Sequence, residues 1–230
     1  AFDRRISENK QYAFSFWPDA ASLARAACDE LEHRGLKKAA AVTTQHEGNY
    51  AMRRALFECS AGKIEYPLSE EVLPEDSDFR TAILRLRQQD VQVVAALLHP
   101  AHLGIFVRSL REQRSSLPVF TLGNFEDLGV RRAAGDALAG QWYPAASYTA
   151  KFVQDYRRRF PDDSIYGAAF GHDAVLLIGK AVEQKKSPKE LPEFFRRADP
   201  FSGALTKVSP DGKNGFDFQV EIKTVGADGL

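Results

Sequence analysis

The sequence DVQVVAALLHPAHLGIFVRSLREQRSSLPVFTLGNFE, residues 90–126, decides the fold. Its unbroken apolar, β-branched run at residues 91–98 is typical of a strand that is buried on both faces of a parallel sheet. His99 and Pro100 end that strand, and apolar side chains at spacings of three and four residues then predict a helix. A second short apolar run follows at residues 119–122. The stretch is therefore one βαβ unit whose two strands end at the same sheet edge, where open α/β sheets bind ligands.

The segments before and after this unit repeat the same alternation of strand and helix. Further strands are predicted at residues 37–44, 64–72 and 138–143. Amphipathic helices are predicted from Asp19 to Gly35, from the turn QHEGN to Gly62, after the acidic run at 75–78, and over 148–160. Strands that alternate with helices predict an α/β fold, in which a doubly wound parallel sheet carries helices on both faces.

The C-terminal third has a different pattern. Residues 166–183 predict a helix that is apolar around much of its circumference and needs packing partners on several sides. A helix at 188–197 and two strand-like runs around Asp211 and Gly212 follow. Two helices and two strands are too few for an independent core, so they either cap the first lobe or belong to a second lobe whose opening strands are absent. Residues 1–12 are polar and without pattern, which is typical of a linker or tail.

The composition limits the classes of partner. The chain has 230 residues, and its 31 Lys and Arg are balanced by 31 Asp and Glu, so no net field favours nucleic acid or an anionic membrane. Small-molecule or protein partners are expected instead. No membrane-spanning segment and no signal peptide are expected. Cys28 and Cys59 are predicted to be two buried thiols; the alternative, a single bridge, needs an oxidising compartment.

Seven collinear segments carry a resemblance to a known family. They are FSFWPDAASLARA, AAAVTTQHEGNYAMRRAL, VLPEDSDFRTAILRLR, DVQVVAALLHPAHLGIFVRSLREQ, LPVFTLGNFEDLGVRRAAGDALAGQWY, AFGHDAVLLIGKAVE and FSGALTKVSPDGKNGFDFQVEIK. Together the segments resemble the type I periplasmic solute-binding proteins of ABC importers, in particular the branched-chain amino-acid-binding (Leu/Ile/Val-binding) family. The resemblance implies a complete second lobe at residues 13–162, to which 218–228 return, and a partial first lobe at 163–217. The face left open on the partial lobe is expected to make the chain dimerise, swap segments or bind hydrophobic dye.

The resemblance also implies a function. Such proteins capture a small organic solute in a cleft between two lobes that close about a hinge, and deliver it to an ABC transporter permease. We expect an amino acid-like solute or an aromatic or apolar carboxylate, and a periplasmic location. The alternative is a ligand-sensing extracytoplasmic domain of a receptor or kinase, because the fold does not fix what responds to the closed state.

By motif position, the resemblance assigns ligand contacts to the ends of three strands. His99 follows the central strand, where the family usually has an aromatic residue. The next loop carries an acidic residue in amino-acid binders; Phe125 matches that position and Glu126 is one residue away, so an aromatic or apolar ligand is also expected. In the loop after the first strand, Tyr50 matches by residue type and Glu47 by spacing.

Three more residues are candidates in the segments assigned to the lobe crossover and the returning helix. Trp17 is expected to wall the cleft. Phe170 and His172 are expected at the cleft end of the helix, with an ordinary helix start as the alternative interpretation. The family's carboxylate-binding groups come from the first lobe, at positions that this sequence does not contain.

Catalytic signatures are missing from the sequence. It has no GxGxxG after a strand, no GxxxxGK[ST], no HExxH and no GxSxG. His99 and His102 are spaced like metal ligands but lack a third ligand nearby. The adjacent carboxylates at 70–71 and 162–163 are expected to be solvated. We therefore expect no enzyme activity, no metal and no cofactor.

Overall fold

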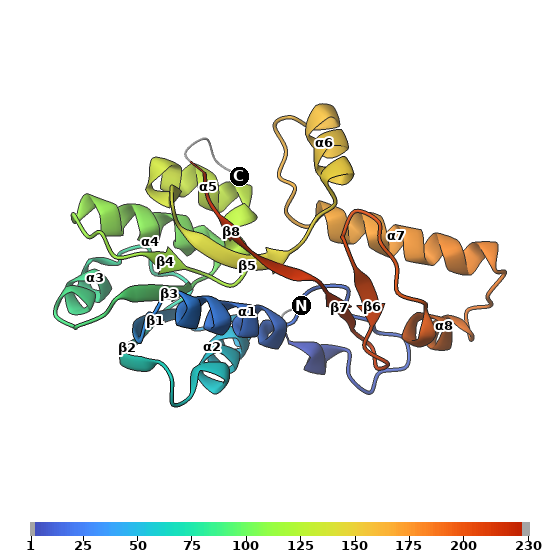
Figure 1. Cartoon of the computed structure of the whole chain (residues 1–230), viewed down its shortest axis with the longest axis horizontal. Helices are drawn as coiled ribbons and strands as arrows, with labels where there is room; N and C mark the ends of the chain where they lie inside the picture. Colours follow the sequence, from blue (N-terminus) through green and yellow to red (C-terminus); the bar gives the residue numbers. More distant parts are fainter. Residues whose placement is uncertain (1–2, 227–230) are drawn as a thin grey trace. The chain divides into compact units, whose positions relative to one another are not determined.

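The computed structural model describes residues 3–226, which form two compact units (Figure 1). Unit 1 contains the described part of residues 1–19 together with residues 146–221. Unit 2 contains residues 20–145 and the described part of residues 222–230. Each unit is described below by itself.

The boundary between the units differs from the predicted one. Residues 146–162 were expected in the lobe at 13–162 but lie in unit 1. The Thr149 N–H donates to the Ala204 carbonyl at 2.8 Å, and the Phe152 ring lies 5.4 Å from that of His172. These partners are far along the chain, so hydrophobic spacing within the segment gave no sign of them. Of the returning segment predicted at 218–228, the last two residues lie outside the described residues.

Unit 2 is built on a six-stranded sheet with the order β2-β1-β3-β4-β5-β8. Its strands are β1 Lys38–Thr44, β2 Glu65–Val72, β3 Val93–Leu97, β4 Val119–Phe120, β5 Trp142–Ala146 and β8 Val220–Thr224. Strands β1 to β5 pair in parallel. Strand β8 runs antiparallel to β5, because the Gly140 N–H donates to Val225 whereas the Ser147 N–H donates to Gln219. The predicted doubly wound α/β fold with an incomplete second lobe is confirmed.

Helices cover both faces of this sheet (Figure 1). They are α1 Ala20–His33, α2 Glu47–Ser60, α3 Arg80–Arg87, α4 Pro100–Glu112 and α5 Leu128–Ala134. Apolar residues of α3, α4 and α5 pack with Ala40, Val42, Val94 and Ala96 in one core on the first face, and α1 and α2 lie on the other. Helix α4 approaches α5 closely at Gly104, where a Cβ would lie 2.4 Å from the Val130 carbonyl oxygen.

The fifth strand and the helix before it differ from the prediction. A strand was expected at 138–143, whereas β5 is Trp142–Ala146 and Leu138 ends a 3₁₀ turn, Gly135–Leu138. Pro144 lies inside β5, and a proline in a strand pattern argues against a strand there. All five residues of β5 are buried, so burial overrides that local preference. Helix α5 was not predicted.

A disulfide joins Cys28 of α1 to Cys59 of α2. The prediction of two separate buried thiols is therefore wrong, and the alternative of a single bridge is right. Both helices lie on one face of the sheet, which brings together two residues separated by 31 positions in the sequence. Hydrophobic periodicity places each cysteine on a packed helix face but does not show which face lies opposite.

Reduction of this disulfide is expected to destabilise unit 2 by about 3 kcal/mol, because the closed loop limits the entropy of the unfolded chain. Thermal unfolding with and without a phosphine reductant measures the effect. The Cys28→Ser/Cys59→Ser double variant should unfold at the lower temperature and should not respond to reductant. An unchanged midpoint for the reduced wild-type chain would contradict the prediction.

Unit 1 combines three helices with a β-hairpin. Its elements are the 3₁₀ helix η1 Arg4–Ile6, helices α6 Ala150–Arg159, α7 Ala168–Glu183 and α8 Leu191–Arg197, and strands β6 Val208–Pro210 and β7 Phe216–Phe218. The strands pair antiparallel across a turn in which Gly212 has a φ of 75°, as predicted. Phe170, Leu177, Leu205 and Phe216 belong to its core.

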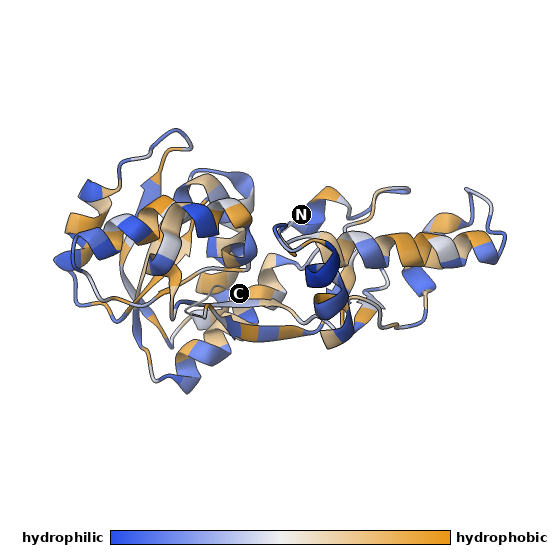
Figure 2. Cartoon of the chain, turned by 90° about the horizontal axis from the view of Figure 1, so that it is seen from above, coloured by the Kyte–Doolittle hydropathy of each residue, from blue (hydrophilic) through white to orange (hydrophobic). Residues whose placement is uncertain are grey.

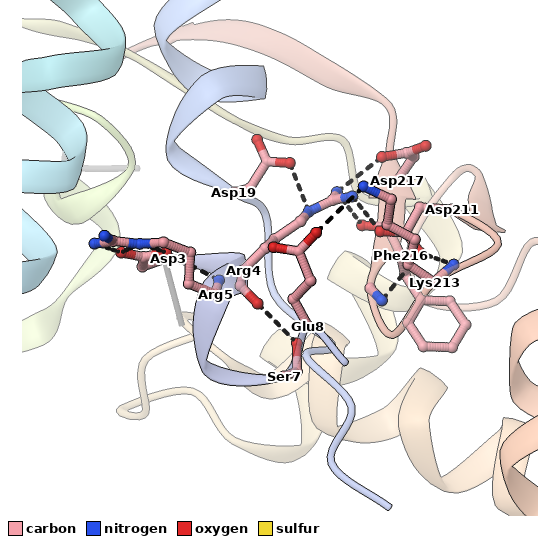
Figure 3. A network of polar contacts seen from close by, with 11 residues as sticks. Asp3, Arg4, Arg5, Ser7, Glu8, Asp19, Asp211, Lys213, Phe216 and Asp217 are labelled. Atoms are coloured by element: carbon pink, nitrogen blue, oxygen red, sulfur yellow. Dashed lines mark hydrogen bonds and ion pairs between the residues drawn. The ribbon is translucent and has the colours of Figure 1, made fainter. Parts of the chain in front are cut away.

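The N-terminal segment is held to this hairpin by a network of ion pairs around Arg4 (Figure 3). The Arg4 guanidinium lies 2.6 Å from a carboxylate oxygen of Asp19, 2.5 Å from Asp211 and 2.8 Å from Asp217. The described part of residues 1–12 is therefore not a detached linker, contrary to the prediction. Opposite charges so far apart in the sequence could not be paired from the sequence alone.

Candidate functional site

The strand order of unit 2 reverses between β1 and β3. These strands are neighbours in the sheet, but α2, which follows β1, and α4, which follows β3, cover opposite faces (Figure 1). Open α/β sheets bind ligands at such a switch point, beyond the C-terminal ends of the strands. The loops after Thr44 and Leu97 therefore form the candidate site.

Two histidines stand at this switch point, one in each loop. His46 and His99 are exposed, and their ring centroids are 6.3 Å apart. The Nδ1 atom of His46 accepts a hydrogen bond from the Gly48 N–H at 3.2 Å, so this side chain caps α2. The backbone N–H of His99 donates to the Thr44 hydroxyl at 3.0 Å, which ties the two loops together.

A third histidine, His102, is buried next to His99, in the first turn of α4. Their ring centroids are 6.2 Å apart, and the His102 ring also contacts Phe79 at 5.9 Å. His102 is 7% exposed, and its Nδ1 atom has no hydrogen-bond partner within residues 3–226. Burial, followed by the positive charge that His99 can carry, lowers the pKa of the His102 imidazole.

This histidine is expected to make stability depend on pH. Because the pKa of His102 is lower in the folded than in the unfolded state, the unfolded chain binds more protons just below pH 6.5. The free energy of unfolding should therefore fall as pH decreases through 6.5, and level off below the folded pKa. Urea unfolding between pH 8 and 5 tests this, with His102→Gln expected to show a shallower slope. Equal slopes for the two proteins would contradict the prediction.

Side-chain amides fix the ends of the central strand. Asn49 Nδ2 donates to the Leu97 carbonyl at 2.7 Å, and Asn124 Nδ2 donates to the Leu98 carbonyl at 3.5 Å. Both asparagines are buried. Neither asparagine, nor His46, was among the residues predicted from the sequence. All three follow an apolar run at the edge where the strands end, and this position could have identified them.

Tyr50 and Glu47, the two alternatives for the first loop, both lie on α2. The Tyr50 hydroxyl donates to Glu71 Oε2 at 3.0 Å, and Glu71 also pairs with Arg53 at 2.6 Å. Burial and this hydrogen bond raise the pKa of Tyr50, whereas the hydrogen bonds from Arg53 and Tyr50 lower the pKa of Glu71. Glu47 is exposed in the first turn, next to His46. Both candidates therefore lie in the first turn of α2, directly after its N-cap residue His46.

Phe125 and Glu126 lie in the interior of unit 2. Phe125 is 0% exposed and packs edge-to-face on Tyr143, with ring centroids 5.7 Å apart. Glu126 is 4% exposed and accepts hydrogen bonds from Lys223 Nζ at 2.7 Å and from the Tyr143 hydroxyl at 3.3 Å. The expected ligand contact by either residue is not supported, because both side chains are already enclosed by the core and by β8.

Trp17 and Phe170 pack together in unit 1. Their ring centroids are 4.5 Å apart. The Tyr166 ring also packs edge-to-face against Trp17, at a centroid distance of 5.4 Å. Phe170 is 6% exposed and belongs to the core. Phe170 lies in the first turn of α7 and packs in this core, which fits the alternative interpretation of an ordinary helix start.

His172 lines a cavity of about 580 Å³ in unit 1. The cavity lies between α6 and α7 and has the aromatic side chains of Phe152, Tyr156 and Phe160 in its wall. His172 Nδ1 lies 2.8 Å from Oδ1 of Asp173. Asp173 is 0% exposed and accepts the N–H groups of Ala204 and Leu205 at 2.7 and 2.8 Å.

The described residues contain neither a cluster of metal-binding side chains nor a membrane-spanning helix. Within residues 3–226, no three His, Cys, Asp or Glu side chains gather in a way that could hold a metal ion. In the same residues, no helix has both the length and the apolar composition needed to cross a membrane.

Solved structures share this fold. A branched-chain amino acid transporter substrate-binding protein from Streptococcus pneumoniae, in complex with isoleucine, is 16% identical with a TM-score of 0.85; the match covers 99% of this chain and 68% of that one. A solute-binding protein from Rhodopseudomonas palustris, in complex with benzoate, is 21% identical with a TM-score of 0.77 and coverages of 92% and 61%. A putative branched-chain amino acid ABC transporter protein from Rhodospirillum rubrum is 18% identical with a TM-score of 0.75.

The matches to solved structures cover only part of the length of those proteins. The alignment spans 93% of this chain but only 65% of the R. rubrum protein. A search of curated protein sequences found no match. The family model for periplasmic binding proteins matches residues 5–220, nearly the whole sequence. The chain belongs to the periplasmic binding protein family.

Proposed function

We propose that this chain is the solute-binding component, or a large part of it, of an ABC importer. It captures a small organic solute outside the cytoplasm and presents it to the transporter permease. The observation that carries this proposal is the pair of exposed histidines at the strand switch point of a periplasmic binding protein fold. The disulfide between Cys28 and Cys59 supports an extracytoplasmic, oxidising location.

The similar structures and the candidate site support a proposal for the solute class. Those proteins were solved with isoleucine and with benzoate, so the candidates are amino acid-like solutes and aromatic or apolar carboxylates. His99, His46 and Tyr50 are the proposed contacts in unit 2, and Trp17 and His172 remain proposed contacts in unit 1. Binding without chemical turnover is proposed, with no cofactor.

A second candidate is a sensing domain of a receptor or kinase. One similar structure is an extracellular ligand-binding receptor from Desulfohalobium retbaense, 16% identical with a TM-score of 0.76; the match covers 92% of this chain and 38% of that one. Co-purification of the full chain with a permease favours the importer, whereas ligand-dependent activity of a fused or associated kinase favours the sensor.

A thermal-shift screen of amino acids, aromatic acids and apolar acids tests the binding function. A ligand at 100 times its Kd stabilises the folded chain by about 2.7 kcal/mol, so a true ligand should raise the unfolding temperature clearly. The shift should grow with the logarithm of ligand concentration. If no solute of any class shifts the midpoint, the proposed function is contradicted.

Helix α7 is strongly hydrophobic along much of its length (Figure 2). Val175 and Val182 are 67% and 70% exposed, and Leu176 and Ile178 are 42% and 51% exposed. Apolar surface on one helix face is the usual mark of an interface. We infer that a second copy of this chain covers it.

Self-association through this face is expected to be lost in a Val175→Glu/Val182→Glu variant. Burying two carboxylates at an apolar contact costs more than the contact gains. Sedimentation equilibrium should show a dimer for the wild-type chain and a monomer for the variant, with Lys185→Glu, in the turn after α7, as the control. A wild-type monomer that binds no hydrophobic dye would contradict the inference.

A further inference from the structure

We propose that His46 and His99 together bind the carboxylate of the solute, and that this solute is an organic acid without an α-ammonium group. The proposal rests on the proposed function and narrows its ligand class. It assigns a binding role to His46, which the sequence did not indicate.

The two imidazoles have the position and the free groups for this contact. They stand on either side of the β1/β3 switch point with ring centroids 6.3 Å apart, and both are exposed. Because His46 Nδ1 accepts the Gly48 N–H, the proton of the neutral ring lies on Nε2, which is therefore a donor. Within residues 3–226 the His99 ring makes ring contacts to His46 and His102 and no hydrogen bond.

The local field adds to the preference for an anion. Helices α2 and α4, of 14 and 13 residues, begin directly after His46 and His99. The N-terminal end of a helix carries a partial positive charge, so both helix dipoles favour negative charge at this edge. The dipoles alone would not define a site, but here they act on the same point as two unoccupied imidazole donors.

The carboxylates around the switch point are not arranged for an ammonium group. Glu126 is enclosed with Lys223 and Tyr143, and Glu71 is held by Arg53 and Tyr50. The remaining one, Glu47, is exposed on the first turn of α2, where its attraction for a cation is weak. An amino-acid ligand would leave its ammonium group facing two histidines.

Other titratable groups near the pair are few. They are Glu47, Tyr50 and Glu71 from α2 and β2, and Asp76 and His102 around the start of α4. Asp76 accepts the Leu73 N–H at 3.0 Å. Burial lowers the pKa of the His102 imidazole, and this buried ring lies next to His99.

Matched ligand pairs test the proposal on the full chain by isothermal titration calorimetry. 4-Methylpentanoate is compared with leucine, and 3-phenylpropanoate with phenylalanine; the members of each pair differ only in the ammonium group. At least one acid should bind more tightly than its amino acid, by about tenfold or more, because the ammonium group no longer faces the positive ends of two helices. Amino acids that bind as tightly as the acids would overturn the inference but leave the proposed function intact. Binding by none of the four would overturn the inference, whereas the proposed function would be contradicted only if the wider thermal-shift screen also found no ligand.

Variants then test the histidines. His46→Gln and His99→Gln should each weaken acid binding about tenfold, which is the usual loss for one charge-assisted hydrogen bond. Glu75→Gln, at an exposed position in the loop after β2, is the control and should leave acid binding unchanged. The double histidine variant should lose most of the affinity for the acids.

The contrary results are equally clear. A double histidine variant with wild-type affinity, or a Glu47→Gln variant that loses binding while the histidine variants keep it, would overturn the proposal. Unchanged circular dichroism spectra and unfolding midpoints of the exposed-site variants separate a binding defect from misfolding.

Discussion

Replacing Asp173 by alanine is expected to destabilise unit 1 by about 4 kcal/mol, because it leaves two buried N–H groups without their acceptor. Those groups belong to Ala204 and Leu205, each 1% exposed, and they donate to the two oxygens of Asp173 at 2.7 and 2.8 Å. The same carboxylate lies 2.8 Å from Nδ1 of His172. One side chain thus joins α7 to the turn before β6.

Urea unfolding followed by circular dichroism measures this loss. Asp173→Asn keeps one acceptor oxygen and should fall between the alanine variant and the wild type. Asp162→Ala is the matched control, since Asp162 is exposed and surface substitutions usually change stability by less than about 0.5 kcal/mol. A loss below about 1 kcal/mol for Asp173→Ala would show that these buried bonds are not the main constraint on the turn.

Replacing Lys223 by methionine is expected to destabilise unit 2 by about 3–5 kcal/mol, because it removes the cation from a buried carboxylate. Lys223 Nζ lies 2.7 Å from Oε1 of Glu126, and their side chains are 18% and 4% exposed. The ion pair joins β8 to the loop after β4, and it explains why Glu126 is enclosed instead of facing a ligand.

The double variant Glu126→Gln/Lys223→Met separates the pair from its surroundings. If the cost comes from the unpaired charge, the double variant should recover most of the stability lost in Lys223→Met, and the thermodynamic cycle should give a coupling of about 2 kcal/mol or more. Additive losses would contradict a direct interaction between the two side chains. The Lys189→Met substitution, at an exposed position, serves as the control.

The central βαβ unit could be predicted because the hydrophobic pattern of each of its elements is visible in its own short stretch of sequence. The buried run before His99 and the helix after it occupy the expected segments, as β3 Val93–Leu97 and α4 Pro100–Glu112. A fully apolar run and a helix with one apolar face need no distant partner to be recognised. The position of the strand ends at one edge then follows from parallel topology, which is why His99 could be placed from the sequence.

The predictions that were wrong or incomplete concern residues whose surroundings are set by parts of the chain far away in the sequence. Phe125 and Glu126 look like loop residues in the sequence but are covered by Tyr143 and by Lys223 of β8. The Cys28–Cys59 bridge depends on which helix faces meet. His46 was missed because nothing in its sequence neighbourhood shows that the next strand in the sheet is β3, which carries His99.

Hydrogen–deuterium exchange of the full chain, with and without a ligand found by the thermal-shift screen, tests the central claim most directly. Ligand binding is expected to slow the exchange of backbone amides at the strand ends of unit 2, in peptides that cover residues 44–50 and 98–103. Protection that is confined to the cavity between α6 and α7, with these two loops unchanged, would contradict it.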